Sequence, residues 1–308
     1  MSTYAYLGPA GTFTEAALNQ LVKPGDTKSA YANTTAALDA VRSGAVVGAL
    51  VPIENSVEGF VARTLDELVI GEPLVITAET TLPVEFALIA QPGVTLQEIT
   101  KIATHPHAEA QCRTYIAKNL PHAEILVSSS TAAAAEEIAQ SQDRTRGAIA
   151  AKVAADHYGL SVLAEDIGDN TGAVTRFVLV TKVGKINERT GHDRTSLAIF
   201  IASDHAGALL EILNEFAVRG VNLTFIQSRP TGAELGSYHF LIDVEGHISD
   251  ARIGDALMGL KRICEDVRFL GSYPRANKYA TEVLRGRSDK DFTDASTWLS
   301  AVRNGNLT

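Results

Sequence analysis

Three short segments combine small, hydroxyl and amide residues that could bind a small polar substrate. In the first, Gly8–Thr14, the glycines permit a close approach of the backbone. The free N–H groups around Gly11 and Thr12, at the start of an expected helix, would favour an anion. A Gly-Pro turn before a helix is also common for structural reasons alone, and no Gly-Lys-Ser/Thr follows as in a nucleotide-binding loop. The segment predicts either an anion site or an ordinary turn.

The second segment, Val51–Ser56, places Glu54, Asn55 and Ser56 at the end of a buried type of strand. Polar side chains at such a position cost free energy unless they cap the next helix or meet a ligand. Both explanations remain open at the level of sequence.

The third segment, Gly172–Phe177, leads into a strand and contains Thr175, Arg176 and Phe177. An arginine beside a hydroxyl group at the start of a strand suits recognition of a carboxylate. A surface arginine on an edge strand would look the same, and Phe177 could either line a site or pack in the core.

The elements that must position these segments alternate between short strands and helices. Tyr4–Leu7 and Val46–Pro52 are expected strands, and each precedes a turn and a helix, the second helix at about Val57–Val69. This repetition predicts parallel strands with crossover helices, and a break is expected at Thr77–Pro83 before the strand Glu85–Ala90. Further elements are expected at Leu96–Ile99, Ile102–Thr104, Ala108–Asn119, Glu124–Val127, Thr131–Gln140, Gly147–Ala150, Ser161–Asp166 and Arg176–Thr181.

The order of these elements predicts an α/β domain over residues 1–183 that has two lobes. The chain leaves the first lobe, builds the second from about residue 82 to 165 and returns, as in periplasmic-binding-protein-like folds. In such sheets, ligands bind in the crevice at the carboxyl ends of the strands.

A polar linker at Val183–Arg194 separates this domain from a second one over residues 195–274. Its expected order is strand, helix, two strands, helix and strand, with strands at Asn222–Ser228, Ser237–Val244 and Asp266–Tyr273. This βαββαβ order is the ferredoxin-like fold. Residues 275–308 form a partly amphipathic tail.

Composition excludes several classes of protein. The 308 residues carry a formal net charge of −9, which gives no support for nucleic-acid binding. Two cysteines without a partner motif, Cys112 and Cys264, indicate a reducing compartment. The N-terminus has no signal-peptide pattern and the apolar stretch Ala45–Ile53 is too short to span a membrane, so a cytoplasmic protein is expected. The eight histidines show no metal-binding spacing, and neither a metal nor another cofactor is expected.

Taken together and in this order, the segments resemble the prephenate dehydratase family. Gly8–Thr14 resembles its Gly-Pro-Gly-Thr-Phe signature, Pro52–Ser56 its Pro-Ile-Glu-Asn-Ser motif, and Thr175–Phe177 its Thr-Arg-Phe motif with the essential threonine. Thr104–Pro106 with Ala110–Cys112 resembles a further family segment. The resemblance implies a carbon–oxygen lyase that converts prephenate to phenylpyruvate, carbon dioxide and water in L-phenylalanine biosynthesis.

The resemblance also implies roles for individual residues. Thr175 would form a hydrogen bond with the departing hydroxyl, and Glu54 could be the acid if burial raised its pKa. Arg176 and the N–H groups of Gly11 and Thr12 would hold a substrate carboxylate. The remaining substrate-binding residues are the neutral donors Asn55 and Ser56 and the ring-lining Phe177.

The second domain resembles an ACT regulatory domain. Gly207–Leu210 resembles its Gly-Ala-Leu motif, and Gln227–Pro230 resembles its Glu-Ser-Arg-Pro motif. The resemblance implies that L-phenylalanine binds between the ACT domains of a homodimer or homotetramer. The implied effector-binding residues are Ala208, Leu209, Leu210, Asn222, Leu223, Gln227, Ser228, Arg229 and Pro230.

Three positions depart from the family pattern: Gln227 replaces a glutamate, His107 stands where glutamine is common, and Ala173 stands where asparagine is common. The first leaves the identity of the effector open, and the third leaves one substrate contact unassigned. Two alternatives also remain open, namely arogenate dehydratase and a non-catalytic small-molecule-binding protein of the same fold.

Overall fold

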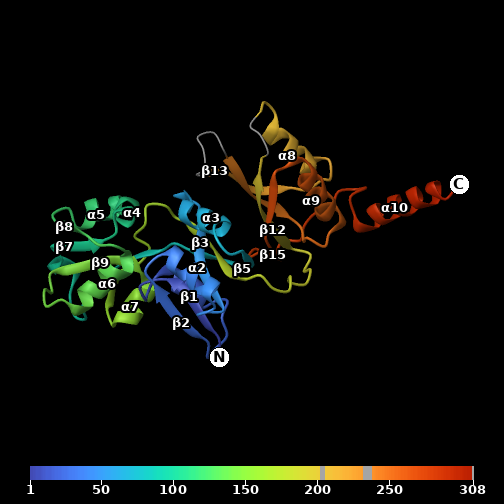
Figure 1. Ribbon diagram of the computed structural model, residues 1–308. Coiled ribbons are helices and arrows are strands. Elements are labelled where there is room, and N and C mark those ends of the chain that lie inside the picture. Colours follow the sequence, from blue (N-terminus) through green and yellow to red (C-terminus); the bar gives the residue numbers. More distant parts are fainter. Residues whose placement is uncertain (202–204, 232–237, 307–308) are drawn as a thin grey trace. The chain divides into compact units, whose positions relative to one another are not determined.

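The computed structural model describes residues 1–201, 205–231 and 238–306, and the chain forms two compact units. The first unit comprises Met1–Glu67 and Thr80–Val180, and the second comprises Leu68–Glu79 and the residues from Thr181 onward. The chain therefore enters the second unit at Leu68, returns to the first unit at Thr80, and enters the second unit again at Thr181. Figure 1 shows the course of the chain, coloured from the N-terminus to the C-terminus.

The first lobe of the first unit is built on a sheet with the strand order β2-β1-β3-β11-β5. Both β2 and β3 pair with β1 in parallel. The strand-turn-helix pattern predicted parallel strands, and the β1–β3 pair confirms it. The short β4 pairs with β3 as an antiparallel hairpin. The strands are β1 Thr3–Leu7, β2 Thr27–Tyr31, β3 Gly48–Asn55, β4 Gly59–Phe60, β5 Leu74–Pro83 and β11 Val174–Lys182, and the helices are α1 Phe13–Leu18, α2 Thr34–Ser43 and α3 Ala62–Val69.

Local sequence explains where the helices of this lobe begin and end. Thr12 caps α1 by accepting a hydrogen bond from the Glu15 N–H group, and Asn33 caps α2 in the same way. Gly44 ends α2 in the left-handed conformation, with φ at 81°. Apolar side chains of α1 then pack on the sheet, which fixes the position of the turn that precedes the helix.

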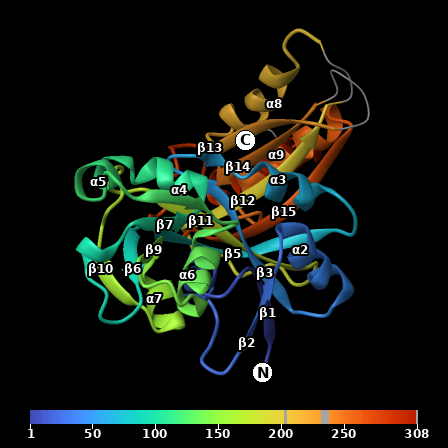
Figure 2. The same cartoon turned by 90° about the vertical axis from the view of Figure 1, so that its left-hand side faces the viewer.

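The second lobe contains a mixed sheet with the order β10-β6-β9-β7-β8 (Figure 2). Small side chains allow α6 to pack closely on this sheet, because Ala134 and Ala135 of the helix meet Ala148 and Ala150 of β9 in one buried cluster. The strands are β6 Phe86–Ala90, β7 Lys101–Thr104, β8 Glu124–Val127, β9 Arg146–Ala151 and β10 Ser161–Ala164, and the helices are η1 Leu96–Glu98, α4 Pro106–Gln111, α5 Arg113–Asn119, α6 Thr131–Gln140 and α7 Lys152–Tyr158.

Two adjacent crossings of the chain join the lobes. The Val84 N–H group, on the way out, donates a hydrogen bond to the Ala173 carbonyl, on the way back, at 2.7 Å. This arrangement confirms the expected two-lobed α/β architecture.

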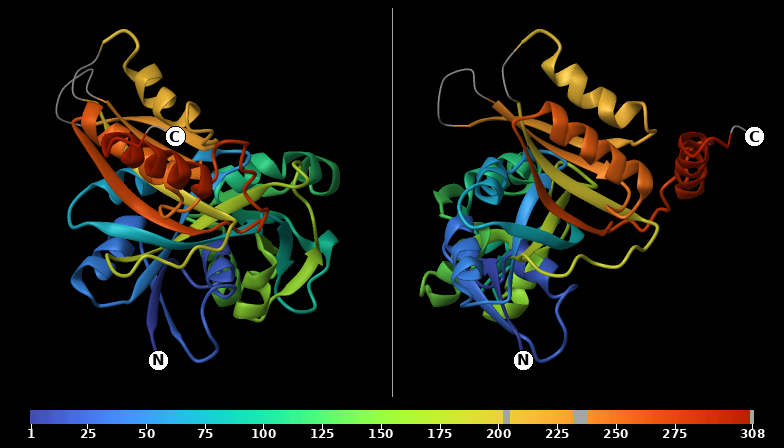
Figure 3. Two further views of the ribbon diagram at one scale, coloured as in Figure 1. Left: turned by 90° about the vertical axis from the view of Figure 1, so that its right-hand side faces the viewer. Right: turned by 45° about the vertical axis from the view of Figure 1, so that its right-hand side comes forward.

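The second unit contains an antiparallel sheet with the order β13-β14-β12-β15. Helices α8 and α9 lie side by side on one face of this sheet, over a buried apolar core (Figure 3). The order βαββαβ confirms the predicted ferredoxin-like domain. The elements are β12 Asp193–Phe200, α8 Ala208–Ala217, β13 Leu223–Pro230, β14 Tyr238–Glu245, α9 Ala251–Ile263 and β15 Asp266–Pro274, and the tail adds α10 Asp289–Arg303.

Several expectations about individual elements were wrong. The expected break at Thr77–Pro83 is part of β5, because pairing with β11 stabilises an extended conformation there. The expected helix Val57–Val69 begins only at Ala62, after a hairpin, and the expected helix Ala108–Asn119 is interrupted at Cys112. Elements β2, α2 and α7 had not been expected. The first residue of the expected strand Ser237–Val244 lies outside the described residues.

Across the described part of the chain, no helix is both long and apolar enough to cross a membrane.

Candidate functional site

Asn55 and Thr175, far apart in sequence, meet where β3 ends and β11 begins. The Asn55 Nδ2 group donates a hydrogen bond to Thr175 Oγ1 at 2.8 Å. Asn55 Oδ1 accepts hydrogen bonds from the Val57 N–H at 2.8 Å and the Glu58 N–H at 2.9 Å. These two donors orient the amide, so that its NH₂ group must face the threonine. Because Thr175 Oγ1 is the acceptor in this contact, its own hydrogen is available to another acceptor.

Ser56 fixes the start of β11 through two hydrogen bonds with Val174. Its N–H group donates to the Val174 carbonyl at 2.9 Å, and its Oγ accepts from the Val174 N–H at 2.9 Å. Ser56 was expected to donate a hydrogen bond to the substrate, but in the structure its hydroxyl oxygen holds the neighbouring strand. This contact holds the backbone next to Thr175.

Glu54 and Arg176 are neighbours of this pair and form an ion pair with each other. Arg176 Nε lies 3.4 Å from Glu54 Oε2, and their side chains are 8% and 44% exposed, respectively. The structure therefore does not provide the burial of Glu54 on which its role as the acid was conditional. A substrate carboxylate at Arg176 would have to share or displace Glu54.

Phe177 is 2% exposed and packs with Tyr6, Leu18 and Leu50 in the core of the first lobe. Its position agrees with the core-packing alternative. Little of its ring surface is left to line a site.

The glycine-rich turn is occupied by the protein's own carboxylate. The Gly11 N–H donates a hydrogen bond to Glu15 Oε2 at 2.7 Å. Thr12 Oγ1 donates to the Leu7 carbonyl at 3.1 Å and accepts from the Glu15 N–H at 3.3 Å. Glu15 thus holds the N–H group of Gly11, which we had expected to be available to a substrate anion. In the structure this segment forms an ordinary helix start, and its role as an anion site stays a prediction.

Gly11 is required here by its conformation and by its neighbours. Its φ is +79°, and a Cβ atom would lie 3.2 Å from Ala154 Cα and 3.2 Å from Tyr158 Cε2 on α7. The Tyr158 hydroxyl donates a hydrogen bond to the Ala10 carbonyl at 2.9 Å. The turn is therefore a packing contact between the two lobes. Burial, with the nearby Glu15 carboxylate, raises the pKa of Tyr6 to about 12.

Sequence reasoning missed Glu58, which connects the hairpin after β3 to α4. Its carboxylate accepts a hydrogen bond from Gln111 Nε2 at 3.0 Å and lies 3.2 Å from His107 Nδ1. The sequence did point to the α4 side of this contact, because Thr104–Pro106 and Ala110–Cys112 resemble a family segment. Nearby, burial and then His107 lower the pKa of His105.

Within the ranges that the structure describes, no three or more histidine, cysteine, aspartate or glutamate side chains are grouped as a metal site would require.

The predicted effector-binding residues fall on two elements of the second unit. Ala208, Leu209 and Leu210 begin α8, and Ala208 lines a cavity of about 60 Å³. Asn222 lies just before β13, and the other predicted residues, Leu223, Gln227, Ser228, Arg229 and Pro230, lie on that strand. Strand β13 is at the edge of its sheet, and its residues alternate between partly buried and exposed. An edge strand of this kind can receive another chain.

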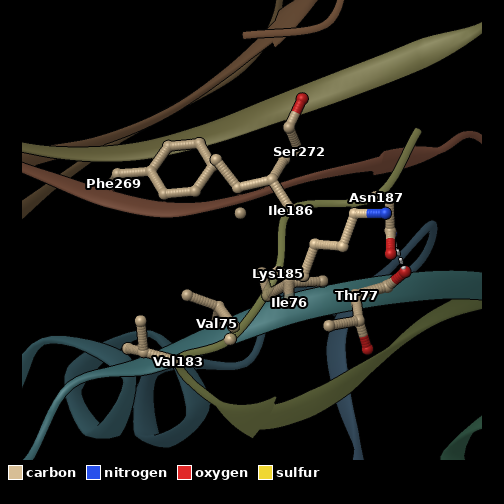
Figure 4. A pocket seen from close by; sticks show the side chains of 11 residues that line it. Val75, Ile76, Thr77, Val183, Lys185, Ile186, Asn187, Phe269 and Ser272 are labelled. Carbon is tan, nitrogen blue, oxygen red and sulfur yellow. Dashed lines mark hydrogen bonds between the residues drawn. The ribbon is translucent and has the colours of Figure 1, made fainter. Parts of the chain in front are cut away.

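A separate cavity of about 140 Å³ lies inside the second unit, and none of the predicted site residues lines it. Figure 4 shows Val75, Ile186 and Phe269 at its wall, together with the hydrogen bond from Asn187 Nδ2 to the Thr77 carbonyl. The linker after β11 is therefore attached to β5 beside an apolar cavity.

The fold and the Asn55–Thr175 site define a two-lobed α/β protein that carries a ferredoxin-like domain. A family model described as prephenate dehydratase matches residues 4–185, and one described as ACT domain matches residues 195–262. The chain belongs to the prephenate dehydratase family, which confirms the resemblance seen in the sequence.

Individual relatives are similar to this chain over most of its length. A curated prephenate dehydratase from Amycolatopsis methanolica is 46% identical and covers 99% of both chains. The crystal structure of a prephenate dehydratase from Arthrobacter aurescens in complex with L-Phe has a TM-score of 0.92 at 49% identity, covering 98% of this chain and 99% of that one. A protein described as a novel type of quorum-quenching acylase, GqqA, has a TM-score of 0.81 at 30% identity, covering 88% and 97%.

Proposed function

We propose that this protein is a lyase that converts prephenate to phenylpyruvate, carbon dioxide and water in L-phenylalanine biosynthesis. The observation that carries the proposal is the hydrogen bond from Asn55 to Thr175, because it joins two family segments at the end of the sheet where ligands bind. Family membership over the whole chain supports the same reaction.

The reaction needs a hydrogen-bond donor at the leaving hydroxyl more than it needs a strong nucleophile. The bond between the ring and its carboxylate breaks, its electron pair enters the ring, and the 4-hydroxyl leaves as water after it gains a proton. The gain of aromaticity drives both steps. In this proposal the Thr175 hydroxyl donates to the departing oxygen and relays a proton from water, since its pKa is too high for it to be the acid itself. Asn55 holds the Thr175 oxygen so that the hydrogen is directed away from the amide.

Other residues are proposed to bind the substrate around this pair. Arg176 would hold the carboxylate that stays on the product, because it is a buried cation whose partner Glu54 is exposed enough to move aside. Glu54 stays a proposed catalytic group, because the substrate carboxylate would take its place at Arg176. Gly11, Thr12, Ser56 and Phe177 stay predicted substrate-binding residues, although the contacts described above are internal to the protein.

We further propose that L-phenylalanine regulates the enzyme by binding the ACT domain. The relative from Arthrobacter aurescens was crystallised with L-Phe, and the ACT model matches this chain. Strand β13 and the start of α8 carry the predicted contacts, and the exposed edge of β13 suits a site completed by a second copy in a homodimer or homotetramer. Calorimetry with phenylalanine, tyrosine and tryptophan tests this, and an absence of heat with all three would contradict it.

The proposal keeps the domain division that the sequence predicted: a catalytic domain at residues 1–183 with its second lobe at about 82–165, an ACT domain at 195–274 and a tail at 275–308. A cytoplasmic location also stays a prediction.

The deciding experiment is an ultraviolet assay for phenylpyruvate after prephenate is added to the purified protein, with and without phenylalanine. Thr175→Ala should lower kcat by about 10²- to 10⁴-fold, the range typical of a positioned proton donor. Thr175→Ser is the matched control, because it keeps the hydroxyl and should keep most of the activity. A Thr175→Ala variant as active as the wild type would remove this residue from the mechanism.

A parallel assay with arogenate separates the two dehydratase activities, since one fold can host different substrates. A faster reaction with arogenate would favour that alternative. If the purified protein binds prephenate or arogenate but converts neither, the result would favour the non-catalytic alternative.

A further inference from the structure

Glu58 makes contacts in two directions from the tip of the hairpin between β3 and β4. Its backbone N–H group donates a hydrogen bond to Asn55 Oδ1 at 2.9 Å, so that it takes part in orienting the amide that holds Thr175. Its carboxylate lies in contact with α4 of the second lobe, 3.0 Å from Gln111 Nε2 and 3.2 Å from His107 Nδ1. One residue therefore joins the candidate site to the opposite lobe.

The second-lobe side of this contact is held in place by its own hydrogen bonds. His105 caps α4 by accepting from the His107 N–H at 3.3 Å. The Gln111 carbonyl accepts from the Asp169 N–H at 2.6 Å, and the Asp169 carboxylate in turn accepts from the Thr114 N–H at 3.2 Å. Gln111 and His107 thus extend from a fixed short helix, which gives Glu58 a defined partner.

We propose that Glu58 is a positioning residue, which aligns Asn55 and Thr175 by tying their turn to α4; the inference rests on the proposed function. The side chains of Glu58 and His107 are 44% and 65% exposed, and even a charged pair at so exposed a position contributes little to stability. The effect of Glu58 is therefore on geometry. When its carboxylate is held by α4, the backbone N–H stays in place and the Asn55 amide keeps its direction. A shift of about 1 Å at a reacting group can cost about 10²-fold in rate.

The test compares Glu58→Ala, Gln111→Ala and the double variant in steady-state assays with prephenate. We expect Glu58→Ala to lower kcat by about 3- to 10-fold with KM nearly unchanged, because Glu58 acts on the reacting groups and not on substrate affinity. The double variant should be no slower than Glu58→Ala, since both changes remove the same link. Glu58→Gln keeps an acceptor for Gln111 and should recover part of the lost kcat.

Glu165→Gln is the matched control, because it breaks an exposed ion pair, to Lys152 at 2.7 Å, that lies wholly within the second lobe. It should leave kcat unchanged. A Glu58→Ala variant with the kcat of this control would overturn the inference, as would an effect confined to KM, or single-variant losses that multiply in the double variant. Absence of turnover in the wild-type protein would instead overturn the proposed function, and the inference with it.

Discussion

Arg194 on β12 and Glu79 on β5 form a buried ion pair inside the second unit, with side chains that are 12% and 3% exposed. The second oxygen of Glu79 accepts a hydrogen bond from the Ala276 N–H at 2.9 Å. Arg194 Nε also lies 4.0 Å from Asp243 Oδ2. The ferredoxin-like sheet is therefore attached by buried charges to the segment Leu68–Glu79 of the same unit.

Glu79→Ala should destabilise the protein strongly, because it removes one partner of a buried pair and leaves the arginine with less compensation. We expect a loss of about 3 kcal/mol in the free energy of unfolding, measured by chemical denaturation. Glu188→Ala is the control: its side chain is 91% exposed and pairs with Lys185 at 3.7 Å, so a change within about 0.5 kcal/mol is expected. Equal denaturation midpoints for the two variants would contradict the prediction.

Asn55→Asp should inactivate the enzyme while it preserves the fold. The carboxylate can still accept hydrogen bonds from the Val57 and Glu58 N–H groups, but it would now accept from the Thr175 hydroxyl too. The hydrogen needed by the leaving group is then engaged, and kcat should fall by about 10²-fold. The melting temperature should stay close to that of the wild type. An active Asn55→Asp variant would show that the direction of the Thr175 hydroxyl is unimportant.

Gly11→Ala should cost more stability than Gly159→Ala, although both glycines have positive φ. At Gly159, with φ at +67°, an added Cβ meets no atom within 4 Å, so only the backbone strain of about 1–2 kcal/mol applies. At Gly11 the added Cβ also presses on α7, at 3.2 Å from Ala154 Cα, which should add about 1–3 kcal/mol. The measurement is the free energy of unfolding of each variant. Equal losses would mean that α7 moves aside freely.

Cys112 should be unreactive in the native protein. Burial, helped by the charges of Asp169 and Glu109, raises the pKa of its thiol to about 12, so little thiolate exists at pH 8. In a Cys264→Ala background, a thiol reagent should react slowly before unfolding and rapidly in denaturant. Fast labelling of the folded protein would contradict the buried position.

The same thiol predicts how stability changes with pH. Its folded pKa lies above the ordinary value of 9.0, so the contribution of this group is fully present below pH 9 and is lost as the pH rises toward about 12. The free energy of unfolding should therefore fall less steeply with rising pH in Cys112→Ala than in the wild type. Identical slopes between pH 9 and 12 would show that another group, such as Tyr6, dominates.

The sequence alone determined the class of fold and most of the candidate segments. Strands and amphipathic helices leave a local periodicity, and caps such as Thr12 and turn residues such as Gly44 act within a few residues of themselves. For that reason the βαββαβ order and the helix Thr131–Gln140 could be predicted from local pattern. The motif segments also carried the family resemblance before any geometry was known.

Only the tertiary structure decided which of these residues meet. The Asn55–Thr175 contact joins residues 120 positions apart, and the ion pair of Glu54 with Arg176 depends on the same pairing of β3 with β11. A break was expected at Thr77–Pro83, although these residues belong to strand β5, because their extended conformation is stabilised by a distant partner and not by their own sequence. Local sequence cannot encode the partner of a strand, since that partner is set by long-range packing. For the same reason the contact of Glu58 with α4 became visible only in the folded chain.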